Sequence, residues 1–135
     1  MDPLTRQLVL HGSLVLLSGF IGGLFFARAI NRAEREVAWR VVHSGATMGG
    51  VMLLALAPLA SQLGVQSWAQ QLVAWSFIIG TEAFVVGMYV AALYGARGLQ
   101  AGGGRINLAV RLCYMVGTSL TLLGSAVLIV GAIRA

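Results

Sequence analysis

Four long apolar stretches constrain the fold of this chain more than any other feature. They run from Leu8 to Ala27, Val41 to Leu63, Leu72 to Leu93 and Leu108 to Ile133. About 20 apolar residues cross a bilayer as a helix, and backbone in lipid must form a helix or a closed barrel. The runs lack the polar and apolar alternation of barrel strands. The 135 residues, 59% of them hydrophobic, are therefore predicted to be an all-α membrane protein, a single domain of four transmembrane helices.

The first apolar stretch has some features of a signal peptide. It is too long for the apolar core of one, however, and Arg28 and Arg32 follow it in the manner of a stop-transfer flank. We expect this stretch to remain in the protein as a helix.

The formal net charge of +5 comes from nine basic residues, all arginine, and their positions argue against a nucleic-acid partner. The arginines of the first loop and its edges are Arg28, Arg32, Arg35 and Arg40, and those around the third are Arg97, Arg105 and Arg111. The second loop, Gln62–Gln71, has none. The positive-inside rule then predicts that loops one and three are cytoplasmic, in the inner membrane of a bacterium, with both termini outside. Binding to an anionic lipid membrane is a sufficient use for these arginines.

The loops carry further local signals. Charges of both signs over residues 29–37 predict a short surface helix or a continuation of the flanking spans. Trp39 and Arg40 are typical of an interface anchor, and Pro58 is expected to kink or fray the end of the second span. The glycine-rich loop over residues 95–105 lacks the Gly-Lys-Ser/Thr ending of a phosphate-binding loop and is interpreted as a flexible connector.

Glycines recur at helical intervals inside the spans. Gly19 and Gly23 are four residues apart, as are Gly45 and Gly49, and Gly117, Gly124 and Gly131 are seven apart. Small residues at these intervals let two helix backbones approach closely. Such faces serve either packing within the chain or contacts between copies, so a homo-oligomer is one expectation.

Four residues in the spans are chemically capable: His11, His43, Glu82 and Tyr89. An ionised carboxylate at the position of Glu82 costs about 2.5–3.5 kcal/mol, so Glu82 is expected to be protonated, paired or wetted. Tyr89 follows seven residues later on nearly the same helix face. The third span is therefore predicted to turn a polar stripe into the bundle.

Each of these residues also has a structural interpretation. Either histidine can be hydrogen-bonded in the core or serve as a ligand of haem iron. Neutral imidazole is a common ligand of this kind. Tyr89 can be an interfacial anchor instead of a pocket residue. Glu82 can be tied to an arginine or histidine of a neighbouring helix. If His11 and His43 faced each other at one depth, they would bracket a haem as in b-type electron carriers.

The motifs around these residues resemble those of one family. The chain has His11-Gly12 in the first span, Trp39-Arg40 followed by His43-Ser44-Gly45 in the second, Gly87-Met88-Tyr89 in the third, and Arg97-Gly98-Leu99 in the third loop. In this order they resemble the styrene oxide isomerases, small four-helix membrane proteins. The resemblance covers nearly the whole chain, with a first loop shorter than is usual in that family.

The resemblance implies a homotrimer that binds haem b near its subunit interfaces. It makes His43 the iron ligand, places Ser44 and Gly45 at the cofactor site, and places Tyr89 in the substrate pocket. By the same resemblance, ferric iron acts as a Lewis acid on a small apolar epoxide, the C–O bond opens, and a 1,2-hydride shift gives the aldehyde. An apolar pocket suits this chemistry because it leaves charge poorly screened and denies water to the cation.

The chain departs from the family pattern in two places. Six residues after His43, where the family has an asparagine, it has Gly49. Glu82 to Val85 replace a more polar and aromatic set before Tyr89. Glu82 is a second catalytic candidate: it binds a different substrate, relays a proton, or pairs with His11.

The leading expectation is thus a haem b-dependent membrane isomerase that converts an epoxide to an aldehyde. One alternative is a related haem protein for sensing or electron transfer, in which His11 is a second cofactor ligand. Another is a small transporter without haem, which leaves the motif at His43 unused.

Overall fold

The described part of the chain consists of four long α-helices. The computed structural model describes residues 1–60, 62, 66–99 and 103–134. The helices are α1 (Pro3–Arg32), α2 (Glu36–Ala60), α3 (Ser67–Tyr94) and α4 (Gly104–Arg134). Each is long and apolar enough to cross a membrane, which confirms the prediction of an all-α chain with four helices of membrane-spanning length.

Local sequence signals explain where the helices begin and end. The Asp2 side chain caps α1 by accepting hydrogen bonds from the backbone N–H groups of Leu4 and Thr5, at 2.9 and 3.0 Å. Ala33 ends α1 in the left-handed conformation, with φ of 52°. Gly95 ends α3 in the same conformation, with φ of 71°, and its N–H reaches Ala91 O at 2.9 Å.

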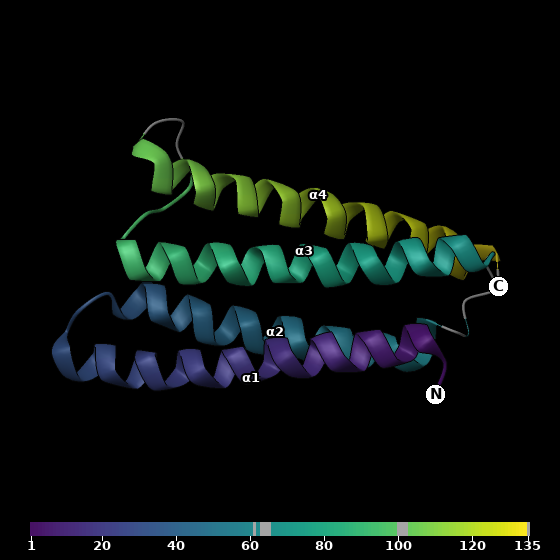
Figure 1. The fold of residues 1–135 in the computed structure, drawn as a ribbon, viewed down its shortest axis with the longest axis horizontal. Coiled ribbons are helices and arrows are strands. Elements are labelled where there is room, and N and C mark those ends of the chain that lie inside the picture. Colours follow the sequence, from purple (N-terminus) through teal and green to yellow (C-terminus); the bar gives the residue numbers. More distant parts are fainter. Residues whose placement is uncertain (61, 63–65, 100–102, 135) are drawn as a thin grey trace.

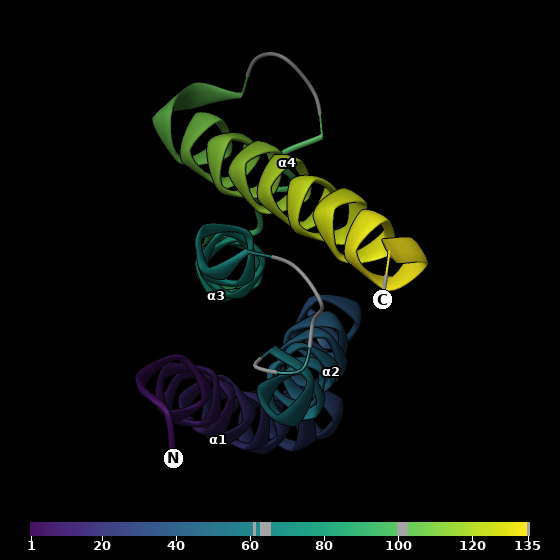
Figure 2. The same ribbon diagram turned by 90° about the vertical axis from the view of Figure 1, so that its right-hand side faces the viewer.

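The helices run up and down in sequence and form two close pairs, α1 with α2 and α3 with α4 (Figure 1). α3 is the central helix because it meets each of the other three. Seen along the helices, α4 lies on the far side of α3 from α1 and α2, so the arrangement is open rather than square (Figure 2). α3 is thus the element on which a site shared between helices depends.

Glycine permits the close approach of α1 and α2. A Cβ atom on Gly19 would lie 2.6 Å from Thr47 N, and one on Gly50 would lie 2.6 Å from Leu16 N. Both contacts are with backbone atoms, so any side chain there would push the helices apart. Other glycines from the predicted faces also meet helices of the same chain: Gly45 and Gly49 lie against α3, and Gly117 and Gly124 lie against Phe84 and Phe77 of α3. These faces are used within the chain, and the expected oligomer rests on the family resemblance instead.

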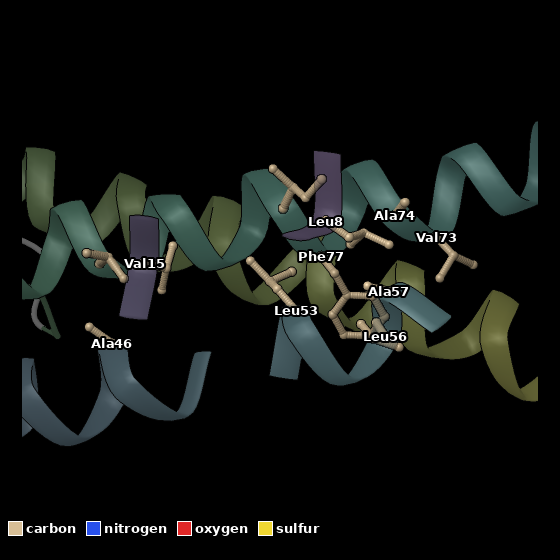
Figure 3. Close-up of a cluster of buried hydrophobic side chains, with 11 residues drawn as sticks. Leu8, Val15, Ala46, Leu53, Leu56, Ala57, Val73, Ala74 and Phe77 are labelled. Carbon is tan, nitrogen blue, oxygen red and sulfur yellow. The ribbon is translucent and has the colours of Figure 1, made fainter. Parts of the chain in front are cut away.

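The main core cluster lies between α1, α2 and α3. Leu8, Leu53 and Ile78 are fully buried in it, and Figure 3 shows the cluster around Leu53 and Phe77. A second cluster, made of Ala29, Trp39, Val42 and Ala92, lies nearer the first loop. Large apolar side chains on the outer faces of all four helices are exposed, as lipid-facing residues are.

The structure refines the predictions for the loops. The charged segment at residues 29–37 continues the spans, because only Ala33 to Arg35 separate α1 from α2. Trp39 is buried in the bundle, with 8% of its surface exposed, so the prediction of an interface anchor misses its packing role.

Pro58 lies in the last turn of α2, which ends at Ala60. The end predicted for the second span, Leu63, lies outside the described residues.

Arg35 fastens the first loop to the end of α3. Its guanidinium donates hydrogen bonds to the carbonyl oxygens of Ala92, at 3.2 Å, and Leu93. These carbonyls belong to the last turn of α3, where they have no partner in their own helix. The contact holds α3 in register with the α1–α2 pair.

Candidate functional site

His43 lies in the third turn of α2 with its ring against α1. Its Nδ1 is 2.8 Å from the carbonyl oxygen of Gly19. Because a carbonyl only accepts, Nδ1 carries the proton and donates it. Nε2 is then the unprotonated nitrogen, with a lone pair available to a metal or a proton. The backbone of α1 thereby sets the tautomer of His43.

The backbone of α1 also forms the surface on which the His43 ring rests. A Cβ atom on Gly23 would lie 2.9 Å from Nδ1 and 3.1 Å from Cε1 of His43. The ring of Phe26 is stacked near the imidazole, with centroids 6.5 Å apart and planes inclined by 22°. The imidazole has little freedom to turn, which suits a group that must point one nitrogen at a ligand.

Tyr89 reaches the same level of α1 from α3. Its hydroxyl donates a hydrogen bond to the carbonyl oxygen of Ser18, 2.6 Å away, next to the carbonyl that holds His43. The ring of Trp39 meets that of Tyr89 edge-on at 6.0 Å and stacks on Phe25 at 4.7 Å. Trp39 is one turn before His43 in α2. Tyr89 and His43 therefore belong to one region, joined through α1 and Trp39.

The three residues of the Gly87-Met88-Tyr89 motif face three different helices. Gly87 lies against Cys113 and Tyr114 of α4, where an added Cβ would be 2.8–2.9 Å from their side chains. Met88 covers Gly45 of α2, and Tyr89 bonds to α1. Successive residues of a helix point about 100° apart, so this short motif positions α3 against all its neighbours.

The other residues of the predicted cofactor motif do not face the His43 ring. The Ser44 hydroxyl is exposed on α2 and donates to Arg40 O of its own helix, 2.9 Å away. Gly45 lies under Met88. In the described chain, Ser44 and Gly45 serve the packing and surface of α2.

His11 and Glu82 are hydrogen-bonded between α1 and α3, with Nδ1 of His11 2.5 Å from Oε1 of Glu82. Of the three roles expected for Glu82, the pairing with His11 is present in the structure. Glu82 and Tyr89 both contact α1, as the predicted polar stripe requires. His11 precedes Gly19 by eight residues, so it lies about 12 Å along α1 from the level of His43. Within one chain the two histidines do not bracket a common iron.

Gly49 lies directly against Thr81 of α3. A Cβ atom on Gly49 would be 2.7 Å from Thr81 Cγ2, so this backbone has no room for an asparagine at position 49. The Thr81 hydroxyl is buried and has no hydrogen-bond partner among the described residues. The Thr81 methyl group, not its hydroxyl, thus faces the position where the family has a polar group on α2.

Sequence reasoning did not identify two parts of the site. The slot for the His43 ring depends on Gly19 and Gly23, which were recognised only as a helix-packing pair. The contact of Trp75 with His11, edge-on at 6.1 Å, joins residues 64 apart that no local pattern connects. The four-residue spacing of the glycines was the only signal for the first, and none existed for the second.

The side chains at this site suit a cofactor that itself supplies most of the ligands of its metal. Among the described residues, no three side chains of His, Cys, Asp or Glu lie close enough to hold a metal ion together. Haem iron needs only an axial ligand from the protein because the macrocycle supplies four nitrogens. A single histidine with a fixed tautomer, such as His43, meets that requirement.

The family model for styrene oxide isomerase matches residues 4–135. The chain belongs to the styrene oxide isomerase family. The match extends over all four helices and includes His43 and Tyr89. No curated protein sequence matches the chain.

Proposed function

We propose that this protein is a haem b-dependent membrane isomerase that converts a small apolar epoxide to an aldehyde. Family membership supports the reaction class. The observation that carries the proposal is the setting of His43, whose Nδ1–H is held by Gly19 O while Nε2 stays available. A hydrogen bond from the second ring nitrogen to a backbone carbonyl is the usual companion of a metal-bound histidine.

Bound haem b would supply a Lewis-acidic ferric iron that polarises the epoxide oxygen. His43 would hold the cofactor through Nε2, and the Gly19 carbonyl would keep the imidazole turned toward it. Gly23 and Phe26 would prevent the ring from rotating away. The chain's task at this position is orientation.

Tyr89 is the proposed substrate-positioning residue. Its hydroxyl donates to Ser18 O, which fixes the oxygen in place and leaves its own lone pairs to accept a hydrogen bond. Trp39 and Met88 pack beside it and present apolar surface. Such a lining favours an aromatic or terpenoid epoxide and keeps water from the cationic centre.

The departure at Gly49 alters the pocket without removing every polar group. The family's asparagine is absent, and the backbone at Gly49 leaves no space for it. Two hydroxyls are buried and unpaired among the described residues: that of Thr81, which meets Gly49 through its methyl group, and that of Thr47, two residues before Gly49 on α2. We expect the natural substrate to differ in shape from those of relatives with asparagine here.

We propose that the active assembly is a homotrimer with the cofactor near a contact between copies. In a single chain His43 is only partly buried. Leu24, which follows on α1 the Gly23 that meets the His43 ring, is more than 70% exposed, and so is Met48, five residues after His43 on α2. A cofactor and a second copy would cover this apolar surface.

The separation of His11 from His43 favours the isomerase over the electron-transfer alternative. A bis-histidine haem closes the coordination position that a Lewis acid must keep open. His11 is already paired with Glu82, about 12 Å along α1 from the level of His43.

The visible spectrum of the purified protein tests the proposal. We expect a Soret band in the wild type and in His11→Ala, and its loss in His43→Ala. Wild type should convert styrene oxide to phenylacetaldehyde without a reductant, and the mass of the assembly in detergent should be that of three chains.

Two results would contradict the proposal at different points. A wild-type protein without a Soret band, even after haem is supplied, would remove the cofactor. A haem-loaded protein that leaves a panel of aryl and terpenoid epoxides unchanged would remove the reaction. A Soret band lost equally in His11→Ala would favour electron transfer.

A further inference from the structure

Two polar contacts join α1 to α3, and together they define a seam between these helices. One is His11 with Glu82 and the other is Ser18 with Tyr89, and each joins residues 71 apart. Because the separation is the same, α1 and α3 run parallel. The His11–Glu82 pair lies about 10 Å nearer to the chain termini than Tyr89 does. The proposed isomerase does not use this pair.

When His11 is neutral, no positive charge compensates the carboxylate of Glu82. When a neutral His11 donates its Nδ1–H to Glu82, the pair carries one net negative charge and leaves two acceptors, Nε2 and a carboxylate oxygen. Glu82 is the only acidic residue within the four predicted spans, and His11 is its only ion-pair partner among the described residues. A net charge at this depth is costly unless a proton or another cation compensates it.

A cavity opens above the pair, between the first turns of α1 and α3. Its volume is about 490 Å³, and we call it the vestibule. Its lining residues are Asp2, Pro3, Leu4, Gln7, Ser67, Gln70, Gln71 and Trp75. Gln7 precedes His11 by one turn, and Trp75 precedes Glu82 by seven residues on the same face of α3. Neither member of the pair lines the vestibule, but Trp75 both lines it and contacts the His11 ring.

The lining of the vestibule is suited to a cation. Asp2 is its only charged residue, and a hydrogen bond from the Thr5 hydroxyl is the main cause that lowers the pKa of Asp2 below its usual value. Asp2 is consequently ionised at neutral pH. The remaining polar groups are amides and a hydroxyl, which can accept hydrogen bonds from an ammonium group.

Trp75 connects the vestibule with the pair. Its indole lines the cavity, is 40% exposed, and meets the His11 ring edge-on at 6.1 Å. The face of an indole is the best aromatic partner for a cation. Pro3 and Leu4 add apolar surface on the opposite wall.

We propose that the vestibule and the His11–Glu82 pair bind a small organic ammonium ion with an apolar group. The ammonium lies at Glu82 and its apolar part lies against Trp75. The ammonium supplies the positive charge that compensates the Glu82 carboxylate. The seam is thus a second ligand site, separate from the region of His43.

The ionisable groups around the pair are few. Asp2 and Arg6 on α1 lie toward the vestibule end, and Tyr89 on α3 lies below. The described ionisable side chains of α2 and α4, namely Glu36, Arg40, His43, Arg105, Arg111, Cys113 and Tyr114, all lie in the halves of these helices nearer the first and third loops. No described ionisable side chain of α2 or α4 therefore lies at the level of the pair.

Calorimetry on the full chain in lipid nanodiscs tests the proposal. The probe is benzylammonium, and benzyl alcohol is its uncharged match. We expect saturable binding of the ammonium and at least about tenfold weaker binding of the alcohol.

Variants identify the site. Glu82→Gln should weaken benzylammonium binding at least about tenfold, whereas Glu34→Gln, the same charge change in the first loop, should leave it unchanged. Gln71→Lys places a competing cation at an exposed position of the vestibule and should also weaken binding. If Glu82→Gln fails to fold, Gln71→Lys decides.

Three results would overturn the proposal. They are equal affinity for benzyl alcohol, an absence of saturable binding, and unchanged binding in Gln71→Lys. None of them bears on the haem spectrum, so this proposal and the proposed isomerase can fail independently.

Discussion

The geometry of His43 depends on the absence of side chains on α1. The Gly19 carbonyl holds Nδ1 at 2.8 Å, and the bare backbone of Gly23 lets the ring lie flat against the helix. Glycine inside a helix costs roughly 0.5–1 kcal/mol relative to alanine, so these positions sacrifice helix stability for close contact. The loss of helix stability is offset by a fixed orientation of Nε2.

Gly23→Ala should disturb the imidazole more than the fold. The new Cβ would lie 2.9 Å from Nδ1, and the ring must turn away from Gly19 O to avoid it. Loss of a hydrogen bond that orients a metal ligand typically costs about 10–100-fold in affinity, so we expect haem affinity to fall by roughly tenfold or more. Titration of apoprotein with haem, followed by the Soret band, measures this.

Gly124→Ala is the matched control for that prediction. It also adds a methyl group to a close helix contact, 3.1 Å from Phe77, but between α3 and α4. We expect it to change the thermal stability and leave haem affinity intact. Equal haem affinity in Gly23→Ala and wild type would show that the ring does not need this slot.

At the scale of elements, α3 organises the molecule because it touches every other helix. Its contact with α2 is tight where Gly49 meets Thr81 and where Gly45 meets Met88. The family has an asparagine where this chain has Gly49. Substitutions at this contact therefore test how the pocket of this chain differs from that of its relatives. A side chain on either helix limits what the other can carry.

Gly49→Asn should destabilise the protein by about 1–3 kcal/mol, because overpacking of a tight contact forces shifts of this cost. Thr81→Ala removes both Cγ2 and the unpaired hydroxyl, so the double variant should recover part of the loss. Stability in detergent, measured by chemical denaturation for all four proteins, gives the coupling energy between the two sites. Strictly additive effects would mean that the two positions do not share space.

The periodicity of the sequence predicted the helices and one face of α3, but not the offsets between helices. The apolar runs gave four spans, and the seven-residue spacing of Glu82 and Tyr89 correctly placed both against a neighbour. The vestibule arises because α3 extends past the start of α1 at this end of the bundle, so that Pro3 is level with Ala74 rather than with Ser67. No local sequence signal gives that offset. The same holds for Arg35, whose hydrogen bonds to Ala92 and Leu93 cross 57 and 58 residues. Tertiary contacts of this kind depend on packing, which periodicity does not encode.

At the scale of the whole molecule, the two ends of the bundle differ in charge. The end with the first and third loops has a groove of about 650 Å³ lined by three arginines, Arg28, Arg32 and Arg35, and by one acidic residue, Glu34. The other end has the neutral to acidic vestibule. The groove suits anionic lipid headgroups at the membrane surface, where each nearby basic residue contributes about 1 kcal/mol.

This asymmetry predicts the orientation of the protein in the membrane. Arginine-rich loops stay on the cytoplasmic side, so the first loop should face the cytoplasm and the second loop the outside. In a Cys113→Ser background, Gln62→Cys should react with a membrane-impermeant maleimide in intact cells, whereas Glu34→Cys should react only after the membrane is opened. The reverse labelling would contradict the orientation. In the predicted orientation the vestibule opens to the outside while His43 lies nearer the cytoplasmic side, so an external ammonium ion would reach the seam without passing the proposed haem region.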